Sequence, residues 1–342
     1  MDPKFQTPFV RTQFFEALTK SRSVCRETGW DPMEWKADEV ALYGFVKSHS
    51  YGEYIFDWSW AEAYERVGLP YYPKFVSMVP FSPVTTPHFS GTGFQKAHAL
   101  FEEFYRKTNL SSAHFLFLPD HEVDFFREEK YLMRETFQYH FENQSYGDFE
   151  GFLSTLKGKR AKTIRQERVT PLSIRRYTGD ELTQDHAKRM YAYYISTIEH
   201  KNSFDYLNEA FFEILFRTMP ENVLFIEASE NDRPVAGSLF LYDEVMLYGR
   251  YWGSHKFFEN LHFELCYYQG IDFCLEKNLR GFEAGAQGEH KISRGFKPVV
   301  IHSAHKLKEP VFQKAVGDFV EKEKIVNRMQ REKLSELLPF KK

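Results

Sequence analysis

The sequence predicts an α/β protein of two tandem domains, each with a mixed, mostly antiparallel sheet flanked by helices. Its length of 342 residues exceeds that of one usual hydrophobic core. Strand-like runs alternate with helical periodicity along the chain. A polar stretch from Glu142 to Gly151 separates two comparable blocks. We therefore predict domains at residues 1–145 and 146–342.

The composition limits the classes of partner. Aromatic residues make up 18% of the chain, enough to fill a core and to line a pocket as well. The formal net charge of −3 gives no global reason for binding nucleic acid or an anionic membrane. DNA is therefore not expected as a partner, and any anion must be bound by a local patch.

Cysteine usage and hydropathy predict a cytoplasmic protein. The three cysteines, Cys25, Cys266 and Cys274, are odd in number and lack metal-ligand spacing. The N-terminus lacks the apolar segment of a signal peptide, and no run is apolar enough to insert into a membrane. The histidines show no paired ligand spacing, so no metal is expected.

The first block alternates strands with helices. Asp57 is expected to cap a helix that carries Trp60, Tyr64 and Val67 at helical spacing. A second helix is expected from Ala97 to Phe104. Strands are expected at residues 41–46, 75–81 and 113–118, and at residues 137–141, where apolar and polar positions alternate.

The second block contains a more specific order of elements. Helical patterns at residues 185–200 and 209–217 precede three closely spaced strands, which should pair as an antiparallel meander. A helix and a further strand follow. This order is typical of the centre of the acetyltransferase (GNAT) fold. The five ranges are Val223 to Ala228, Pro234 to Tyr242, Val245 to Trp252, Leu261 to Leu275 and Gly281 to Gly285.

The last segment is predicted to be one charged, amphipathic helix. It begins near Val311 and is expected to pack on the body through Phe312, Val316 and Phe319.

The strongest signal for a site is the stretch from Glu283 to Lys291, which follows a predicted strand. Its glycines allow close backbone approach to a ligand, and its carboxylates and histidine can accept a proton. A polar loop of solvated charges is the alternative interpretation. The catalytic candidates are Glu283, Glu289 and His290. The substrate-binding candidates are Gln287, Lys291 and Arg294 here, with Arg250 and Trp252 on the predicted strand Val245 to Trp252.

A second cluster lies between a strand and a helix, from Lys47 to Tyr54. It combines a cation, an imidazole, a carboxylate and phenols, so it is a second candidate for substrate binding; a structural turn is an equal alternative. Its candidate residues are Lys47, His49, Tyr51 and Glu53.

A third cluster is basic. No acidic residue lies between Leu156 and Gln166 to neutralise it, which favours anion binding over a solvated helix face. Its candidate residues are Lys157, Lys159, Arg160 and Lys162.

Two of these segments carry a resemblance to a known family. The stretches Lys47 to Tyr54 and Glu283 to Lys291, with Tyr71-Tyr72-Pro73-Lys74 and Arg294-Gly295-Phe296, are similar to bacterial FemAB-like predicted N-acyltransferases of peptidoglycan biosynthesis and recognition. The resemblance covers nearly the whole chain and implies two tandem GNAT-like domains.

The resemblance also implies a reaction, the transfer of an acyl or aminoacyl group to an amine. The acceptor would be a small molecule or a peptide-bearing molecule such as a peptidoglycan precursor. The donor would be acyl-CoA or aminoacyl-tRNA, and no tightly bound cofactor is expected. The loop Gly253-Ser254-His255-Lys256 lacks the Arg/Gln-x-x-Gly-x-Gly pattern that binds acyl-CoA pyrophosphate. The alternative is a non-catalytic module of the same fold that binds a cell-wall precursor or another anionic ligand.

Overall fold

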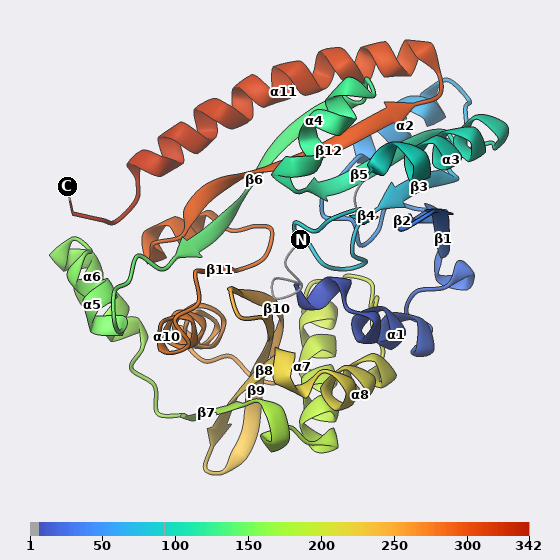
Figure 1. Cartoon of the computed structure of the whole chain (residues 1–342). Coiled ribbons are helices and arrows are strands. Elements are labelled where there is room, and N and C mark those ends of the chain that lie inside the picture. Colours follow the sequence, from blue (N-terminus) through green and yellow to red (C-terminus); the bar gives the residue numbers. More distant parts are fainter. Residues whose placement is uncertain (1–6, 92, 342) are drawn as a thin grey trace. The chain divides into compact units, whose positions relative to one another are not determined.

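The structure, a computed structural model, describes residues 7–91 and 93–341, which form two compact units (Figure 1). The first unit contains Val24–Phe137 and Val300–Arg331. The second contains the described residues up to Ser23, then Gln138–Val299 and the residues from Glu332 onward. The units are thus interleaved along the chain, and the predicted single division between residues 145 and 146 does not coincide with them.

The first unit contains a sheet and the helices that flank it. Its strands are β1 Trp30–Ala37, β2 Val40–Lys47, β3 Lys74–Ser77, β4 Phe89–Ser90 and β5 Ser112–Leu118, with parts of β6 Leu132–Glu142 and β12 Lys297–Leu307. Its helices are α2 Trp58–Arg66, α3 Phe94–Lys107, α4 Asp120–Glu128 and most of α11 Pro310–Glu336. The strands β1, β2, β3, β5 and β12 pair in that order, and only β3 with β5 is parallel.

Aromatic rings fill the core of the first unit. Phe75 and Phe101 lie with ring centroids 4.5 Å apart, and Phe115 and Phe126 with centroids 4.4 Å apart. All four side chains are fully buried. Rings at these separations attract each other beyond the hydrophobic gain from burying their area. The high aromatic content of the sequence is thus used largely for packing in this unit.

The second unit contains the predicted meander. Its helices are α1 Thr12–Lys20, α5 Phe149–Ser154, α6 Gly158–Glu167, α7 Gln184–His200, α8 Glu209–Thr218, α9 Leu261–Phe263 and α10 Gln269–Glu276. Its strands are β7 Ser173–Tyr177, β8 Val223–Glu230, β9 Arg233–Tyr242, β10 Met246–Ser254 and β11 Gly281–Glu283. The strands β8, β9 and β10 pair antiparallel, as predicted, while β11 is parallel to β10 and antiparallel to β6.

Helices cover both faces of this meander (Figure 1). The position of Gly237 on β9 lies against the ring of Tyr193 from α7. The next residue, Ser238, points to the other face, where its hydroxyl donates to the carbonyl oxygen of Leu265. That carbonyl belongs to a π-helical segment, Glu264–Tyr268, which joins α9 to α10. Burial on both faces explains why β8 and β9 are almost continuously apolar.

The sequence analysis did not identify β1 or β7, and both are edge strands. An edge strand has one bonded neighbour and more contact with solvent, so it tolerates proline and charged residues. The sequence Trp-Asp-Pro-Met-Glu-Trp-Lys-Ala of β1 and the sequence Ser-Ile-Arg-Arg-Tyr of β7 follow that rule. Their polarity hides the strand pattern.

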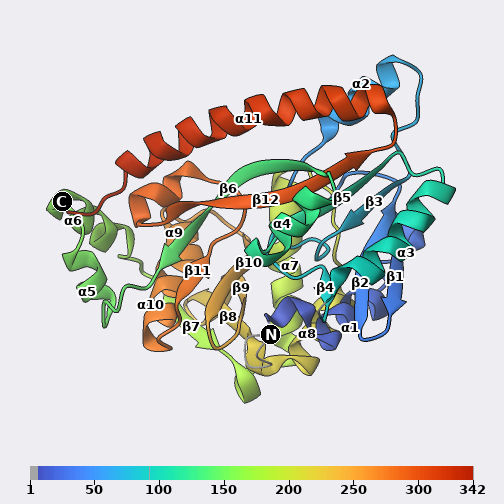
Figure 2. The ribbon, with the colours of Figure 1, turned by 45° about the horizontal axis from the view of Figure 1, so that its top comes forward.

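The C-terminal helix α11 runs along β6 and β12 in both views (Figures 1 and 2). Its Val316 and Val320 are buried against Trp60 and Tyr64 of α2, and the ring of Phe312 stacks on Tyr64 at 3.8 Å. The expectation for Phe312 and Val316 is thus confirmed. The expectation for Phe319 is wrong, because its side chain is 42% exposed.

Candidate functional site

A row of polar side chains crosses three neighbouring strands of the second unit. Glu283 on β11 is the register partner of Tyr248 on β10 and of His140 on β6. Side chains of register partners project from the same face of a sheet, so these three lie side by side. We call Tyr248, Glu283 and His140 the sheet-face row.

The row lies on the face opposite to α10. Phe282, which precedes Glu283, packs against the backbone of Gly270 in α10, and Gly249, which follows Tyr248, faces Phe282. Because successive residues alternate across a strand, Glu283 and Tyr248 project the other way. On that side the ring of Phe9 lies 5.2 Å from Tyr248, edge to face.

Two further polar residues border the row. The Arg250 guanidinium lies 4.5 Å from the ring centroid of Phe9, and its Nη1 donates to the carbonyl oxygen of Gly249 at 2.7 Å. Gln138 is buried, and its Oε1 lies 3.4 Å from Nε2 of His140. Arg250 was predicted as a substrate-binding residue; Gln138, His140 and Tyr248 were not identified.

Burial sets the charge states in the row. It raises the pKa of Glu283 to about 7, although the Arg250 guanidinium opposes the shift. Burial also lowers the pKa of His140 to about 4, with Lys291 and Arg250 acting in the same direction, so this imidazole is neutral at pH 7. The Oε2 atom of Glu283 is buried and has no hydrogen-bond partner among the described residues.

These properties are those of a proton acceptor. A general base works best when its pKa is close to the working pH, because enough of it is ionised and the transfer remains favourable. Glu283 meets that condition through desolvation, as many catalytic carboxylates do. An unsatisfied buried carboxylate oxygen is also costly, so a ligand that donates a hydrogen bond there would relieve that cost.

The other two catalytic candidates lie in the loop beyond β11. Glu289 and His290 begin a 3-10 helix, Glu289–Arg294, and both are exposed, as is Gln287. The Nε2 atom of His290 lies 2.9 Å from the hydroxyl of Tyr267. Glu289 and His290 are therefore exposed to solvent, in contrast to Glu283.

The two cations of this loop turn inward. The Lys291 ammonium donates to the carbonyl oxygen of Gly285 at 3.0 Å, and burial lowers its pKa to about 7. Arg294 binds Glu167 at 2.8 Å and stacks on the ring of Phe263 at 3.5 Å. Both contacts fix the conformation of the loop. Trp252 packs edge to face on His262 at 4.9 Å, in the same region.

The second predicted cluster is a buried ionic network in the first unit. Lys47 is fully buried, with its ammonium 3.2 Å from Glu53 and 3.2 Å from the ring centroid of Trp30. Burial lowers the pKa of Lys47 to about 7 and raises that of Glu53. Of the four candidate residues in this cluster, only Tyr51 is exposed. His49 is half-buried and accepts a hydrogen bond from the backbone N–H of Tyr51.

The centre of that network is Lys74, which the sequence analysis did not select. Its ammonium donates to Asp57 at 2.5 Å, to Glu53 at 2.8 Å and to Ser50 at 2.7 Å. Burial opposes the charge of Lys74, yet the two carboxylates raise its pKa. Asp57 stands at the N-cap of α2 as predicted, but its carboxylate makes no capping hydrogen bond and binds Lys74 and Tyr71 instead. In the sequence Lys74 follows Tyr71-Tyr72-Pro73, and this local pattern does not indicate that its ammonium is the centre of a buried network.

The basic run divides into two sets. Lys157, Lys159 and Lys162 are exposed at the start of α6. Arg160 turns inward, and its Nε donates to the carbonyl oxygen of Ser293 at 2.5 Å. The acidic residues that the local sequence lacks come from elsewhere in this unit: Arg165 binds Glu150, and Arg168 binds Glu264 and Asp272.

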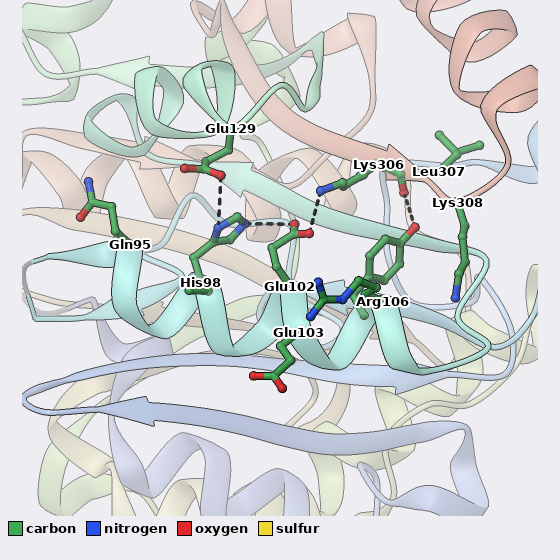
Figure 3. A pocket seen from close by; sticks show the side chains of 11 residues that line it. Gln95, His98, Glu102, Glu103, Arg106, Glu129, Lys306, Leu307 and Lys308 are labelled. Carbon is green, nitrogen blue, oxygen red and sulfur yellow. Dashed lines mark hydrogen bonds and ion pairs between the residues drawn. The ribbon is translucent and has the colours of Figure 1, made fainter.

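A surface pocket of about 680 Å³ lies in the first unit beside α3 (Figure 3). Several of its polar side chains have partners within the protein: Glu102 accepts from Lys306 at 2.7 Å and from Tyr131 at 2.7 Å, and the His98 ring lies 3.4 Å from Glu102. These contacts already engage part of the charge around the pocket.

Two kinds of feature are absent from the part of the chain that the structure describes. Residues 7–91 and 93–341 contain no group of His, Cys, Asp and Glu side chains placed to hold a metal ion. Within the same ranges, no helix combines the length and apolar character needed to cross a bilayer.

Comparisons with known proteins agree with this fold. A family model named FemAB_like, described as peptidoglycan biosynthesis/recognition, matches residues 3–342. No curated protein matches the sequence. The structure is similar to L-PGS from Bacillus licheniformis, with a TM-score of 0.55 at 9% identity over 92% of this chain and 98% of that one.

Two further solved structures share the fold. FemX has a TM-score of 0.53 at 9% identity, covering 88% of this chain and 92% of its own. A conserved protein of unknown function from Bacteroides thetaiotaomicron has a TM-score of 0.52 at 11% identity, covering 88% of this chain and 99% of its own.

Proposed function

The chain belongs to the FemAB-like family, and from that premise we propose that it transfers an acyl or aminoacyl group to an amine acceptor. The observation that carries the proposal is Glu283, a buried carboxyl whose pKa burial raises to about 7. Such a group can take a proton from an ammonium near neutral pH. Its place in the sheet-face row puts it beside other polar side chains that can orient a substrate.

The proposed reaction begins with transfer of a proton from the acceptor's ammonium group to Glu283, which leaves a neutral amine. The amine nitrogen then attacks the carbonyl carbon of the donor and forms a C–N bond, while the carbonyl oxygen takes the negative charge. Collapse of this intermediate breaks the bond to the leaving group, which takes up the proton that the attacking nitrogen loses. Arg250 is the cation that we assign to the oxyanion, because preorganised charge is effective where water is excluded.

We propose aminoacyl-tRNA as the donor class. The loop Gly253-Ser254-His255-Lys256 lacks the glycine pattern that binds acyl-CoA pyrophosphate. The exposed Lys157, Lys159 and Lys162 gather three cations at the start of one helix, which suits a polyanionic backbone. The acceptor class that the family supports is a peptidoglycan precursor with a free amine.

The test is a transfer assay with purified protein. One arm of the assay mixes aminoacyl-tRNA that carries labelled amino acids with a UDP-muramyl pentapeptide, and a parallel arm uses acyl-CoA as the donor. The mass of the acceptor is then measured by mass spectrometry. We expect the acceptor to gain the mass of one aminoacyl group. A gain only in the acyl-CoA arm would change the donor class.

The second candidate function is a non-catalytic binding module. It rests on the fold, because a fold by itself does not specify catalysis. Saturable binding of the UDP-muramyl peptide without product from either donor would support this alternative and contradict transfer.

A further inference from the structure

Four aromatic rings contact one another in succession on the surface of the first unit, in the segment that joins β2 to α2. The rings of His49, Tyr51, Trp58 and Phe56 follow in that order, with neighbouring centroids 5.5, 5.1 and 6.2 Å apart. Tyr51 is 38% exposed and Phe56 is 42% exposed, while the other two are half-buried. We call these four side chains the aromatic row. Single exposed aromatic residues are ordinary, but a contiguous patch of them marks an interaction surface.

The buried ionic network lies beneath this segment and fixes it. Ser50, Glu53 and Asp57 turn inward, and all three accept hydrogen bonds from the ammonium of Lys74. An ammonium has three N–H donors, so these contacts use every one of them. Inward-facing polar side chains thus alternate along the segment with the outward-facing rings. The network therefore holds the turn whose outer side carries the aromatic row.

The backbone of the segment is constrained as well. The ammonium of Lys47 donates to the carbonyl oxygen of Tyr51 at 2.7 Å. Tyr54 has a φ of 63°, which a residue other than glycine seldom adopts, and a Cβ atom at Gly52 would overlap the ring of Phe81. Such backbone persists only where its surroundings enforce it, and it is concentrated at ligand-binding sites. Rings held in this way lose little conformational entropy when a ligand binds.

We propose that the aromatic row binds a neutral carbohydrate chain. One face of a sugar ring presents C–H groups with a small positive charge, and the face of an aromatic ring is negative, so the two attract each other when they stack. The hydroxyl groups of a sugar need hydrogen-bond partners as well. Ser48 and Ser59 are exposed next to His49 and Trp58 in the sequence, and their hydroxyls are uncharged donors and acceptors.

The charges of the segment argue against a nucleic acid as the ligand. From Ser48 to Glu65 the chain contains four acidic residues and no lysine or arginine. The cations that contact this segment do so from inside the protein: Lys47, Lys74 and Arg134 are all buried, and Arg134 donates to the carbonyl oxygen of Phe56. A polyanion needs accessible cations to neutralise its phosphate groups. An uncharged ligand has no such requirement.

The arrangement of the rings also argues against a cationic ligand. Sites for quaternary ammonium groups surround the cation with aromatic faces. Here the rings contact one another in succession, and those of Phe56 and Trp58 are nearly parallel, with an interplanar angle of 20°. A series of rings offers several stacking positions, which suits a ligand made of linked sugar units.

The first test is the binding of a neutral oligosaccharide, chitohexaose, to the whole protein by isothermal titration calorimetry. We expect saturable binding with an affinity that is the same at low and high salt, because no ion pair contributes to it. The assay contains no donor and measures no transfer. Its outcome is therefore independent of the transfer assay, and either result can fail while the other holds.

Substitutions in the aromatic row test the location of the site. Trp58→Ala and Tyr51→Ala should each weaken chitohexaose binding by about tenfold or more, because each removes an aromatic contact. Trp58→Phe keeps a ring and should retain most of the affinity. Tyr43→Ala is the matched control, since Tyr43 is 46% exposed on β2 of the same unit but lies outside the row. This variant should bind like the wild type, and a melting curve for each variant confirms that it is folded.

Three outcomes would overturn the proposal. One is the lack of saturable binding of chitohexaose to the wild type. Another is binding that neither Trp58→Ala nor Tyr51→Ala weakens, which would place the sugar elsewhere on the molecule. The third is salt-dependent binding of a uridine oligonucleotide, in place of the sugar, that Trp58→Ala abolishes. That result would assign the aromatic row to nucleobases.

Discussion

Glu283 on β11 lies directly opposite His140 on β6, so that a carboxyl with a pKa of about 7 has a neutral imidazole as its register partner. Burial produces both shifts, since a low-dielectric site disfavours the charged form of either group. At pH 7 the His140 imidazole is therefore neutral, and the Glu283 carboxyl is only partly ionised. A substrate amine that approaches this pair meets one group able to accept a proton.

Glu283→Gln should lower turnover by about 10² to 10⁴ fold and leave the fold intact, because the amide keeps the shape and loses the basic oxygen. Steady-state kinetics and a melting curve measure the two effects. The matched control is Glu142→Gln, an exposed carboxylate two residues beyond His140 on β6, which should keep its activity. If instead Glu289→Gln or His290→Ala abolishes turnover and Glu283→Gln does not, the base lies in the loop.

The pH dependence follows from the raised pKa of Glu283. The ratio kcat/KM should rise with pH through about 7 and then level off, because only the carboxylate accepts a proton. The free energy of unfolding changes with pH in the opposite direction. The folded state holds this proton up to about pH 7 and the unfolded state only to its ordinary value of 4.5, so the contribution to the free energy of unfolding is present below pH 4.5 and is lost as pH rises to 7.

Urea unfolding of wild type and Glu283→Gln at pH 4.5 and pH 8 measures that loss. Wild type should lose stability relative to the variant between the two values. A difference between the proteins that does not change with pH would mean that the pKa of Glu283 is not raised.

Lys74→Met should lower the free energy of unfolding by about 3 to 5 kcal/mol, since it leaves Asp57 and Glu53 buried without their shared cation. Lys96→Met is the control. Lys96 binds Asp38 at 2.5 Å, as Lys74 binds Asp57, but both side chains of that pair are about 70% exposed. Such an exposed pair contributes little to stability, because solvent and salt screen its charges. If urea unfolding showed that Lys74→Met and Lys96→Met lower the free energy of unfolding equally, the network around Lys74 would not be buried.

Gly253→Ala should destabilise the second unit strongly. A Cβ atom at this position of β10 would overlap the carbonyl oxygen of Tyr193 in α7, and backbone cannot move aside as a side chain can. Gly158→Ala is the contrast, because its Cβ would meet no atom within 4 Å at the first position of α6. That variant should be neutral or slightly stabilising. Thermal melting compares the two, and a Gly253→Ala melt like that of wild type would contradict the close approach of α7 to β10.

Lys159→Ala and Lys162→Ala should weaken the binding of tRNA and reduce its salt dependence, with a change in the slope of log K against log salt of about 1 for each lysine that contacts phosphate. Their stability should hardly change. Arg160→Ala should instead lower stability and leave the binding of tRNA nearly unchanged, because its guanidinium supports the backbone at Ser293. Binding titrations at several salt concentrations, with a melting curve for each variant, separate these roles. Unchanged slopes would remove α6 from the binding surface.

The sequence by itself predicted the elements whose pattern is local. The meander β8 to β10, the helix that follows it and the strand β11 are given by apolar runs and turn residues. Glu283 was selected as part of the stretch, rich in glycine and ionisable residues, that follows this strand. The alternation of Gln138, Tyr139 and His140 was also visible. What the pattern lacked was the register that places His140 opposite Glu283.

Only the tertiary structure decided which charges are buried and what they bind. Lys74 is an ordinary lysine in the sequence, and it becomes the centre of a network because β3, the Ser50–Glu53 turn and the start of α2 converge on its ammonium. Arg160 and Lys159 are neighbours with the same charge, yet one bonds the backbone and the other meets solvent. Hydrophobic periodicity is a property of neighbours along the chain, so the sequence alone reveals it. Desolvation and ion pairing depend on atoms that the fold brings together from distant positions, so only the tertiary structure reveals them.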